Sequence, residues 1–104
     1  MTTTDPMSGF DETIHAPNRL RICATLYAVD EAEFGTVREL LGVAPSVLSK
    51  HVAVLTEAGY VTQRRATRDT RQRVWLRLTK EGRTAYESHL TALRAIVATG
   101  ERDG

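Results

Sequence analysis

The stretch Ser46-Val-Leu-Ser-Lys-His-Val-Ala-Val-Leu-Thr-Glu-Ala-Gly-Tyr-Val61 decides the fold of this chain. Within it Leu48, Val52 and Leu55 are four and three residues apart, so they share one face of a helix. The opposite face carries Lys50 together with short hydroxyl side chains. A cation and small hydrogen-bonding groups suit the base edges and phosphates of a DNA major groove. The stretch therefore predicts an amphipathic helix whose exposed face can contact DNA.

A shorter helix is predicted upstream, over residues 36–41. Thr36 followed by Glu39 is a capping box that fixes the start of this helix, and Gly42 ends it. Pro45 fits the first turn of the next helix, where its missing N–H costs nothing. Two helices joined by a tight turn that contains glycine form a helix-turn-helix. Its shared core is expected to contain Leu40, Leu41, Val43, Leu48 and Leu55.

A basic hairpin is predicted downstream, with strands at 60–65 and 72–78 around a polar loop at 66–71. In the second strand Val74, Leu76 and Leu78 alternate with Arg73, Trp75 and Arg77, which is typical of a half-buried strand. Residues 60–78 contain six arginines against one acid, Asp69, and so carry a net charge of +5. The whole chain carries +1, so the remainder carries −4. Such a concentration of positive charge on one hairpin indicates phosphate binding.

In this order the helix-turn-helix and the basic hairpin resemble the winged-helix transcription regulators of the MarR and ArsR type. The resemblance covers about residues 17–97. The motifs that carry it are Pro17–Ile22, Leu48–His51 with Leu55–Val61, Asp69–Arg71 and Leu78–Arg83. It implies an α+β, mainly α, winged helix-turn-helix with a three-stranded small sheet, a two-stranded wing and a C-terminal helix. The chain departs from the MarR pattern because it lacks a long N-terminal dimerisation helix and has only one helix after the wing.

The expected DNA-binding surface combines helix 45–58, in the major groove, with wing residues 64–73, on the minor groove and backbone. An exposed helix lysine is usually only solvated, but on the second helix of a helix-turn-helix a DNA contact is favoured for Lys50. His51, at the edge of the buried stripe, is predicted to pack or to contact phosphate. The resemblance further implies that Asp69 orients a guanidinium. The predicted contacts are Thr36, Pro45, Ser46, Val47, Ser49, Lys50, His51, Arg64, Arg65, Arg68, Asp69, Arg71 and Arg73.

The remaining elements are predicted from shorter signals. A first main helix is expected over residues 18–29, with Asn18 as its N-cap and Cys23 in the core. A short strand near Phe34-Gly35 is expected to pair with the wing. A leading helix between Phe10 and His15 is expected to pack on the domain.

The last helix is predicted over residues 79–98, opened by Thr79 and Gly82. Its apolar stripe comprises Tyr86, Leu90, Leu93 and Val97, spaced 4, 3 and 4 residues apart. The stripe either packs on its own domain or forms a two-fold dimer interface, and the dimer is favoured. Residues 10–98 then form one domain between flexible tails at 1–9 and 99–104.

Several classes of protein are disfavoured by composition. The chain of 104 residues contains a single cysteine, and no N-terminal signal peptide or run of 18 apolar residues is present. His15, His51 and His89 are widely separated, and no Cys-x-x-Cys occurs, so neither a metal nor a cofactor is expected. No phosphate-binding glycine loop or catalytic motif indicates an enzyme. These features favour a cytoplasmic location.

The sequence thus predicts a sequence-specific DNA-binding regulator: a homodimeric repressor that occupies an inverted-repeat operator in double-stranded DNA and blocks polymerase. A winged helix that binds protein is an alternative, although such a wing has no need of six arginines. A regulator with a small-molecule pocket at the dimer seam, in a cleft lined by Tyr27 and Tyr86, is another; its effector is unknown.

Overall fold

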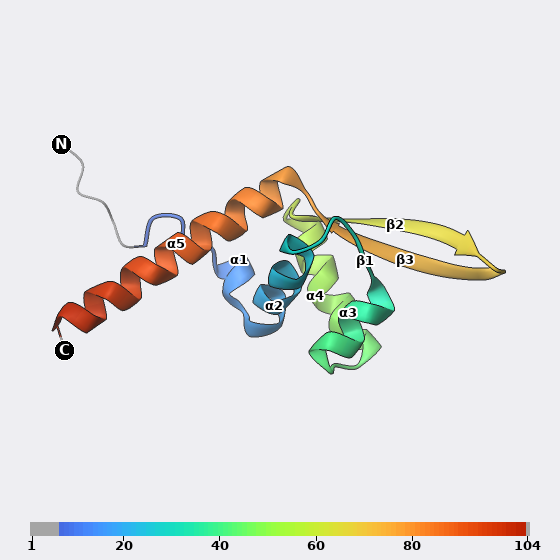
Figure 1. Cartoon of the computed structure of the whole chain (residues 1–104), viewed down its shortest axis with the longest axis horizontal. Helices are drawn as coiled ribbons and strands as arrows, with labels where there is room; N and C mark the ends of the chain where they lie inside the picture. Colours follow the sequence, from blue (N-terminus) through green and yellow to red (C-terminus); the bar gives the residue numbers. More distant parts are fainter. Residues whose placement is uncertain (1–6, 104) are drawn as a thin grey trace.

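The computed structural model describes residues 7–103, except for the side chains of residues 68 and 101–103. Its elements are α1 (Glu12–His15), α2 (Pro17–Tyr27), β1 (Ala32–Glu33), α3 (Phe34–Leu41), α4 (Pro45–Glu57), β2 (Val61–Arg68), β3 (Arg71–Leu78) and α5 (Lys80–Asp103). The molecule is elongated, with extents of 58 × 27 × 20 Å. Figure 1 shows why: α5 and the β2–β3 hairpin project in opposite directions from the cluster formed by α1 to α4. The predicted winged helix-turn-helix is confirmed.

The three strands form one antiparallel sheet in the order β1-β3-β2. The β2–β3 ladder runs without a break from Val61↔Leu78 to Arg68↔Arg71. Only Asp69 and Thr70 connect the strands, with φ of 52° and 63°. Positive φ at both central residues is what a type I′ hairpin turn requires. The loop predicted at 66–71 was therefore too long, because backbone pairing continues towards the turn past Val74, the first apolar side chain of β3.

The segment before the helix-turn-helix differs from the prediction by two residues. The short strand β1 lies at Ala32–Glu33 and not at Phe34-Gly35, and it pairs with Leu76 and Trp75 of β3. α3 begins directly afterwards, with Glu33 as N-cap and no side-chain capping bond. The Thr36 capping box was therefore wrong: pairing with β3 fixes the chain up to Glu33, and Thr36 falls inside the helix.

The start of α2 was also misplaced by the sequence analysis. Its N-cap is Ala16, and Pro17 occupies the first turn, where a fixed φ is favourable. Asn18 is therefore inside the helix, which ends at Tyr27 rather than at residue 29.

The core lies where α2, α3, α4 and the base of the sheet meet α5. Its buried members are Ile14, Ile22, Cys23, Leu26, Val37, Leu41, Leu48, Val52, Leu55, Val61, Leu76, Leu78 and Tyr86, with Val43 partly buried against them. Leu40, however, is 62% exposed, so its predicted place in the core was wrong. Val37 and Leu41 are four residues apart and form the buried face of α3, from which Leu40 is rotated by roughly 100°.

Thr79 directly precedes α5 and opens it as predicted, because its hydroxyl accepts a hydrogen bond from the N–H of Gly82 at 2.9 Å. A Cβ at Gly82 would lie 2.2 Å from the carbonyl oxygen of Tyr60, so no side chain fits between this turn and the start of β2. The helix continues to Asp103, past the predicted end at residue 98. Residues 7–9 form a turn, and residues 1–6 and 104, part of the tails predicted to be flexible, lie outside the described chain.

Candidate nucleic-acid interface

α4 has the buried and exposed faces that its spacing predicts. Leu48, Val52 and Leu55 are at most 2% exposed, and Pro45 occupies the first turn. Gly59, at φ +84°, ends the helix, while the N–H of Tyr60 donates to the carbonyl of Leu55. The first two turns leave Ser46, Val47, Ser49 and Lys50 exposed on one surface. This surface, with a cation and small side chains, is able to enter a major groove.

His51 lies beside Lys50 and is half-buried. Its Nδ1 is 3.2 Å from Nη1 of Arg19 on α2. Burial, followed by the nearby charges of Arg19 and Lys50, lowers the pKa of His51. Sequence reasoning missed Arg19, because no local spacing relates it to a histidine 32 residues away.

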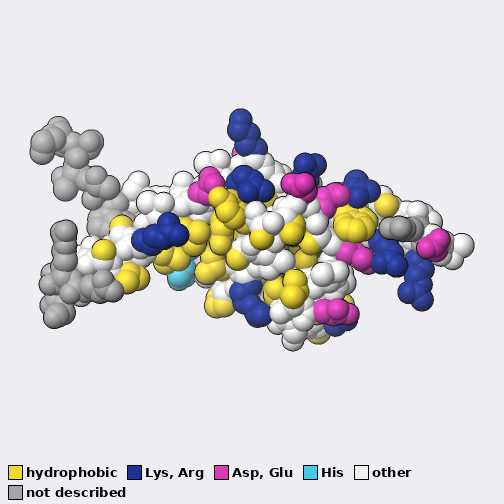
Figure 2. Space-filling model, in the orientation of Figure 1, with side chains coloured by type: hydrophobic (Ala, Val, Ile, Leu, Met, Phe, Trp, Pro, Cys, Tyr) yellow, Lys and Arg dark blue, Asp and Glu magenta, His cyan; other side chains and the backbone are white. Residues whose placement is uncertain are grey.

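Four arginines of the wing fall into two groups within the described chain, those without an ion pair and those paired with a glutamate. Arg65 and Arg71 are exposed and form no ion pair with any described residue. Arg64 donates from Nε and Nη2 to the carboxylate of Glu31 at 3.0 and 2.9 Å, and Arg73 donates from Nη1 to both oxygens of Glu33 at 2.9 Å. Figure 2 shows the resulting surface, with acidic side chains among the basic ones towards the wing. The predicted cationic hairpin is thus partly neutralised by acids at β1 that the sequence analysis did not single out.

Asp69 and Trp75 are two further residues of the wing. The carboxylate of Asp69 forms no ion pair with Arg71. Asp69 instead lies in the hairpin turn, where its backbone has a positive φ. Trp75 is half-buried, with the Arg64 guanidinium 5.7 Å from its ring centre. The side chain of Arg68 lies outside the described residues.

The structure brings together two histidines that the sequence separates widely. His89, fully buried on α5, accepts a hydrogen bond at Nδ1 from the backbone N–H of Asp11 at 2.9 Å. Its Nε2 lies 3.2 Å from Nδ1 of His15. Because Nδ1 of His89 accepts, neutral His89 carries its proton on Nε2 and donates to His15. The two histidines are therefore close in space, and the expectation that they are far apart was wrong. Nε2 of His89 donates to His15, so it is not free to bind a metal.

The Asp11 side chain extends this network. It accepts from the Tyr60 hydroxyl at 2.6 Å and from the N–H of Ile14 at 3.1 Å. Nearby Cys23 is buried, and burial, followed by the charge of Asp11, raises the pKa of its thiol to about 12. Cys23 is therefore a protonated core residue. No group of three or more potential metal ligands occurs among the described residues.

Comparison with known proteins agrees with this geometry. Residues 18–97 match the model of a family described as the winged helix DNA-binding domain. The chain belongs to that family. The transcriptional regulator homologue from Pyrococcus horikoshii OT3 has a similar structure, with 26% identity, a TM-score of 0.81 and coverage of 86% of this chain and 88% of that one.

Two more proteins are similar to this winged helix domain. The YusO protein from Bacillus subtilis is 25% identical with a TM-score of 0.75, and the match covers 85% of this chain and 62% of that one. The uncharacterized protein MJ0432 of Methanocaldococcus jannaschii is 28% identical over 72 residues, which are 69% of this chain and 78% of that protein. The family is one of DNA-binding proteins, not of enzymes. Within the described range, no helix of the winged helix domain has the length and apolar character needed to cross a membrane.

The apolar stripe of α5 divides between the core of the winged helix domain and its surface. Tyr86 is 8% exposed and its ring centre lies 5.0 Å from that of Tyr27, while Leu90 packs partly buried against the core. Leu93 is half-buried and Val97 is 57% exposed. The first half of the stripe therefore packs on its own domain, which is the alternative that the sequence left open for the whole stripe.

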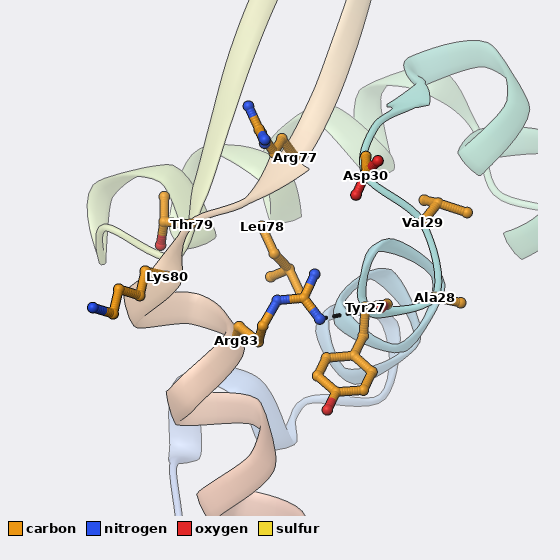
Figure 3. A pocket seen from close by; sticks show the side chains of 9 residues that line it. All are labelled: Tyr27, Ala28, Val29, Asp30, Arg77, Leu78, Thr79, Lys80 and Arg83. Atoms are coloured by element: carbon orange, nitrogen blue, oxygen red, sulfur yellow. Dashed lines mark hydrogen bonds between the residues drawn. The ribbon is translucent and has the colours of Figure 1, made fainter.

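A hollow of about 900 Å³ lies between the end of α2 and the start of α5. Its lining residues are Tyr27, Ala28, Val29, Asp30, Arg77, Leu78, Thr79, Lys80 and Arg83. Figure 3 shows Arg83 lying over Tyr27, whose carbonyl it contacts at 3.4 Å, while Arg77 and Lys80 point away from Arg83. The cations therefore do not converge on one position, and Tyr86, expected to line an effector cleft, is not among the lining residues.

Proposed function

We propose that this winged helix protein is a sequence-specific transcriptional regulator that represses by occupying its operator. The observation that carries the proposal is the exposed surface of α4, with Ser46, Val47, Ser49 and Lys50, next to a wing that carries six arginines. α4 enters the major groove and reads base edges, whereas the wing contacts the backbone and the minor groove. Occupancy of a site that overlaps a promoter excludes polymerase.

The repressor acts as a homodimer in the cytoplasm, where its DNA is. One winged helix offers one recognition helix, which is a small footprint for locating an operator. Two copies joined along the exposed half of α5 present two such helices, so the operator is an inverted repeat. Similarity to the transcriptional regulator homologue from Pyrococcus horikoshii supports this function. A protein-binding role is less favoured, because arginines on a wing suit phosphate better than a protein surface.

Alanine substitutions in α4 and the wing test the proposal. Lys50→Ala should change the preferred sequence, since a specific base contact is worth roughly 1–3 kcal/mol. Arg65→Ala and Arg71→Ala should weaken binding to all sequences and reduce the salt dependence by about one unit. Affinity and sequence preference are measured by selection from random duplex DNA, followed by titration at several salt concentrations.

Lys80→Ala is the matched control, because it removes one exposed cation at the start of α5, outside α4, the β2–β3 wing and the half of α5 proposed for the dimer. It should alter neither sequence preference nor salt dependence. Lys50→Ala and Arg71→Ala proteins that bind DNA like the unmodified chain would contradict the assignment.

A further inference from the structure

Arg19 connects the N-terminal segment to the recognition helix. Its Nε donates to the carbonyl of Thr13 at 2.5 Å, and its Nη1 lies 3.2 Å from Nδ1 of His51 on α4. An arginine side chain remains protonated and has donors but no acceptor. The direction of this second bond is therefore fixed: Arg19 donates and Nδ1 of His51 accepts.

An accepting Nδ1 determines the form of the His51 ring. A neutral imidazole has one N–H, so the proton of His51 is on Nε2. The charged side chains that act on His51 are Arg19, from α2, and Lys50, its neighbour on α4. Both are cations and both oppose protonation of the ring, as does its burial.

The remaining nitrogen faces outward. Nε2 of His51 has no hydrogen-bond partner among the described residues, and it is not one of the buried atoms that lack a partner. An N–H donor is thus accessible at the residue that follows Lys50 on α4.

We propose that Arg19 is a positioning residue of the DNA-binding surface, which holds His51 as an Nε2–H tautomer so that it meets DNA as a neutral donor. This inference rests on the proposed function. Lys50 and His51 then have different tasks although they are adjacent. Lys50 displaces a counterion and contributes to the salt dependence of binding, whereas neutral His51 donates one directed hydrogen bond and does not.

The tautomer can be observed in the free full-length chain by long-range ¹⁵N–¹H correlation spectroscopy of the histidine rings. At neutral pH we expect the His51 spectrum of a neutral ring protonated at Nε2. In Arg19→Met the fixed donor is lost, so the tautomers should mix and the pKa of His51 should rise. Arg19→Lys, which retains a donor, should restore the original tautomer.

Arg21→Met is the matched control, because Arg21 lies on the same helix and its guanidinium contacts Asn18 and the Leu40 carbonyl only at 3.5 Å. It should leave the His51 spectrum unchanged. A protonated or Nδ1–H His51 in the unmodified protein would overturn the inference. So would a His51 spectrum and pKa that Arg19→Met does not change.

Binding to a labelled mixed-sequence duplex provides the functional measurement. Below the raised pKa, His51 of Arg19→Met becomes a cation, and the salt dependence of binding should increase by about one unit relative to neutral pH. The increase should be absent from Arg21→Met and from the double variant Arg19→Met/His51→Gln. An equal increase in the double variant would overturn the role of Arg19. Failure of the unmodified protein to bind any duplex would instead refute the proposed function, whatever the spectra show.

Discussion

At the scale of single residues, His89 is a buried titratable group that uses both of its ring nitrogens in hydrogen bonds. One ring nitrogen accepts from the Asp11 backbone and the other donates to His15, so protonation of His89 must break one of these bonds. Burial, followed by the charge of His15, lowers its pKa, and the charge of Asp11 opposes this only in part. A histidine whose pKa is lower in the folded chain binds a proton more readily when unfolded. Its contribution to stability is therefore complete above the unfolded pKa, about 6.5, and is lost as the pH falls through the lower folded pKa.

The free energy of unfolding should consequently decrease between neutral pH and about pH 5. His89→Leu should be less stable at neutral pH, because the Asp11 N–H loses its acceptor, but its melting temperature should depend less on pH. Thermal unfolding followed by circular dichroism over this pH range measures both effects. His51→Gln serves as the comparison, since the pKa of His51 is also lowered and accounts for part of the slope. Equal pH slopes in His89→Leu and the unmodified protein would refute the assignment.

At the scale of elements, the wing is restrained by the acids of β1 and the turn before it. The Arg64–Glu31 and Arg73–Glu33 pairs join side chains that are partly exposed, from 26% to 55%. Exposed pairs of this kind contribute about 0–1 kcal/mol, so DNA phosphates can replace the carboxylates at little cost. In the free protein, however, Glu31 and Glu33 reduce the positive potential of the wing and hold two of its guanidiniums in place.

Glu31→Gln and Glu33→Gln should therefore strengthen DNA binding without regard to sequence. The released arginines should also make affinity fall more steeply with salt. Melting temperatures should change little, because the pairs are weak. Glu12→Gln, an exposed acid on α1, is the charge-matched control and should have a smaller effect. Titration of a duplex over a range of salt concentrations measures this, and unchanged or weaker binding by both wing variants would contradict it.

The elements that the sequence predicted well are those whose signal is local. The stripe of Leu48, Val52 and Leu55 predicts which face of α4 is buried, and the alternation of β3 predicts which face of the wing is buried. The pairing of Arg64 with Glu31, and of His15 with His89, depends on how residues 33 and 74 positions apart meet in space. No periodicity encodes such contacts. The boundaries of β1 and α3 were missed for the same reason, because pairing with β3 overrides the Thr36 capping signal.

At the scale of the whole molecule, α5 is longer than the core it covers. Its 24 residues span roughly 36 Å, and Figure 1 shows its C-terminal half extending past α1 and α2. Tyr86 and Leu90 pack within their own chain, whereas Leu93, Ile96 and Val97 belong to the extended half. We therefore expect the dimer contact to lie on that half alone, a narrower surface than the sequence predicted.

Leu93→Glu combined with Val97→Glu should yield monomers with much weaker operator affinity. The core should remain intact, since neither residue is part of the buried cluster. Thr91→Glu combined with Ala95→Glu adds the same charge to exposed positions on another side of α5 and should leave the dimer unchanged. Sedimentation velocity distinguishes the two species. An unmodified protein that remains monomeric at tens of micromolar, roughly the range of weak dimers, both free and on DNA, would exclude the dimer.

The hydrogen bond between Asp11 and His89 also limits how far the domain can be truncated at its N-terminal side. The family match begins at residue 18, yet Ile14 is fully buried and Asp11 supplies the acceptor and donor that Tyr60 and His89 use. A fragment excised at Pro17 and fused to another protein would retain every element of the common motif. This fragment would nevertheless leave Nδ1 of His89 without its donor, and the loss of Ile14 would leave a cavity beneath α5. The shortest fragment that keeps these contacts therefore starts at Phe10, whose ring packs against both His15 and His89.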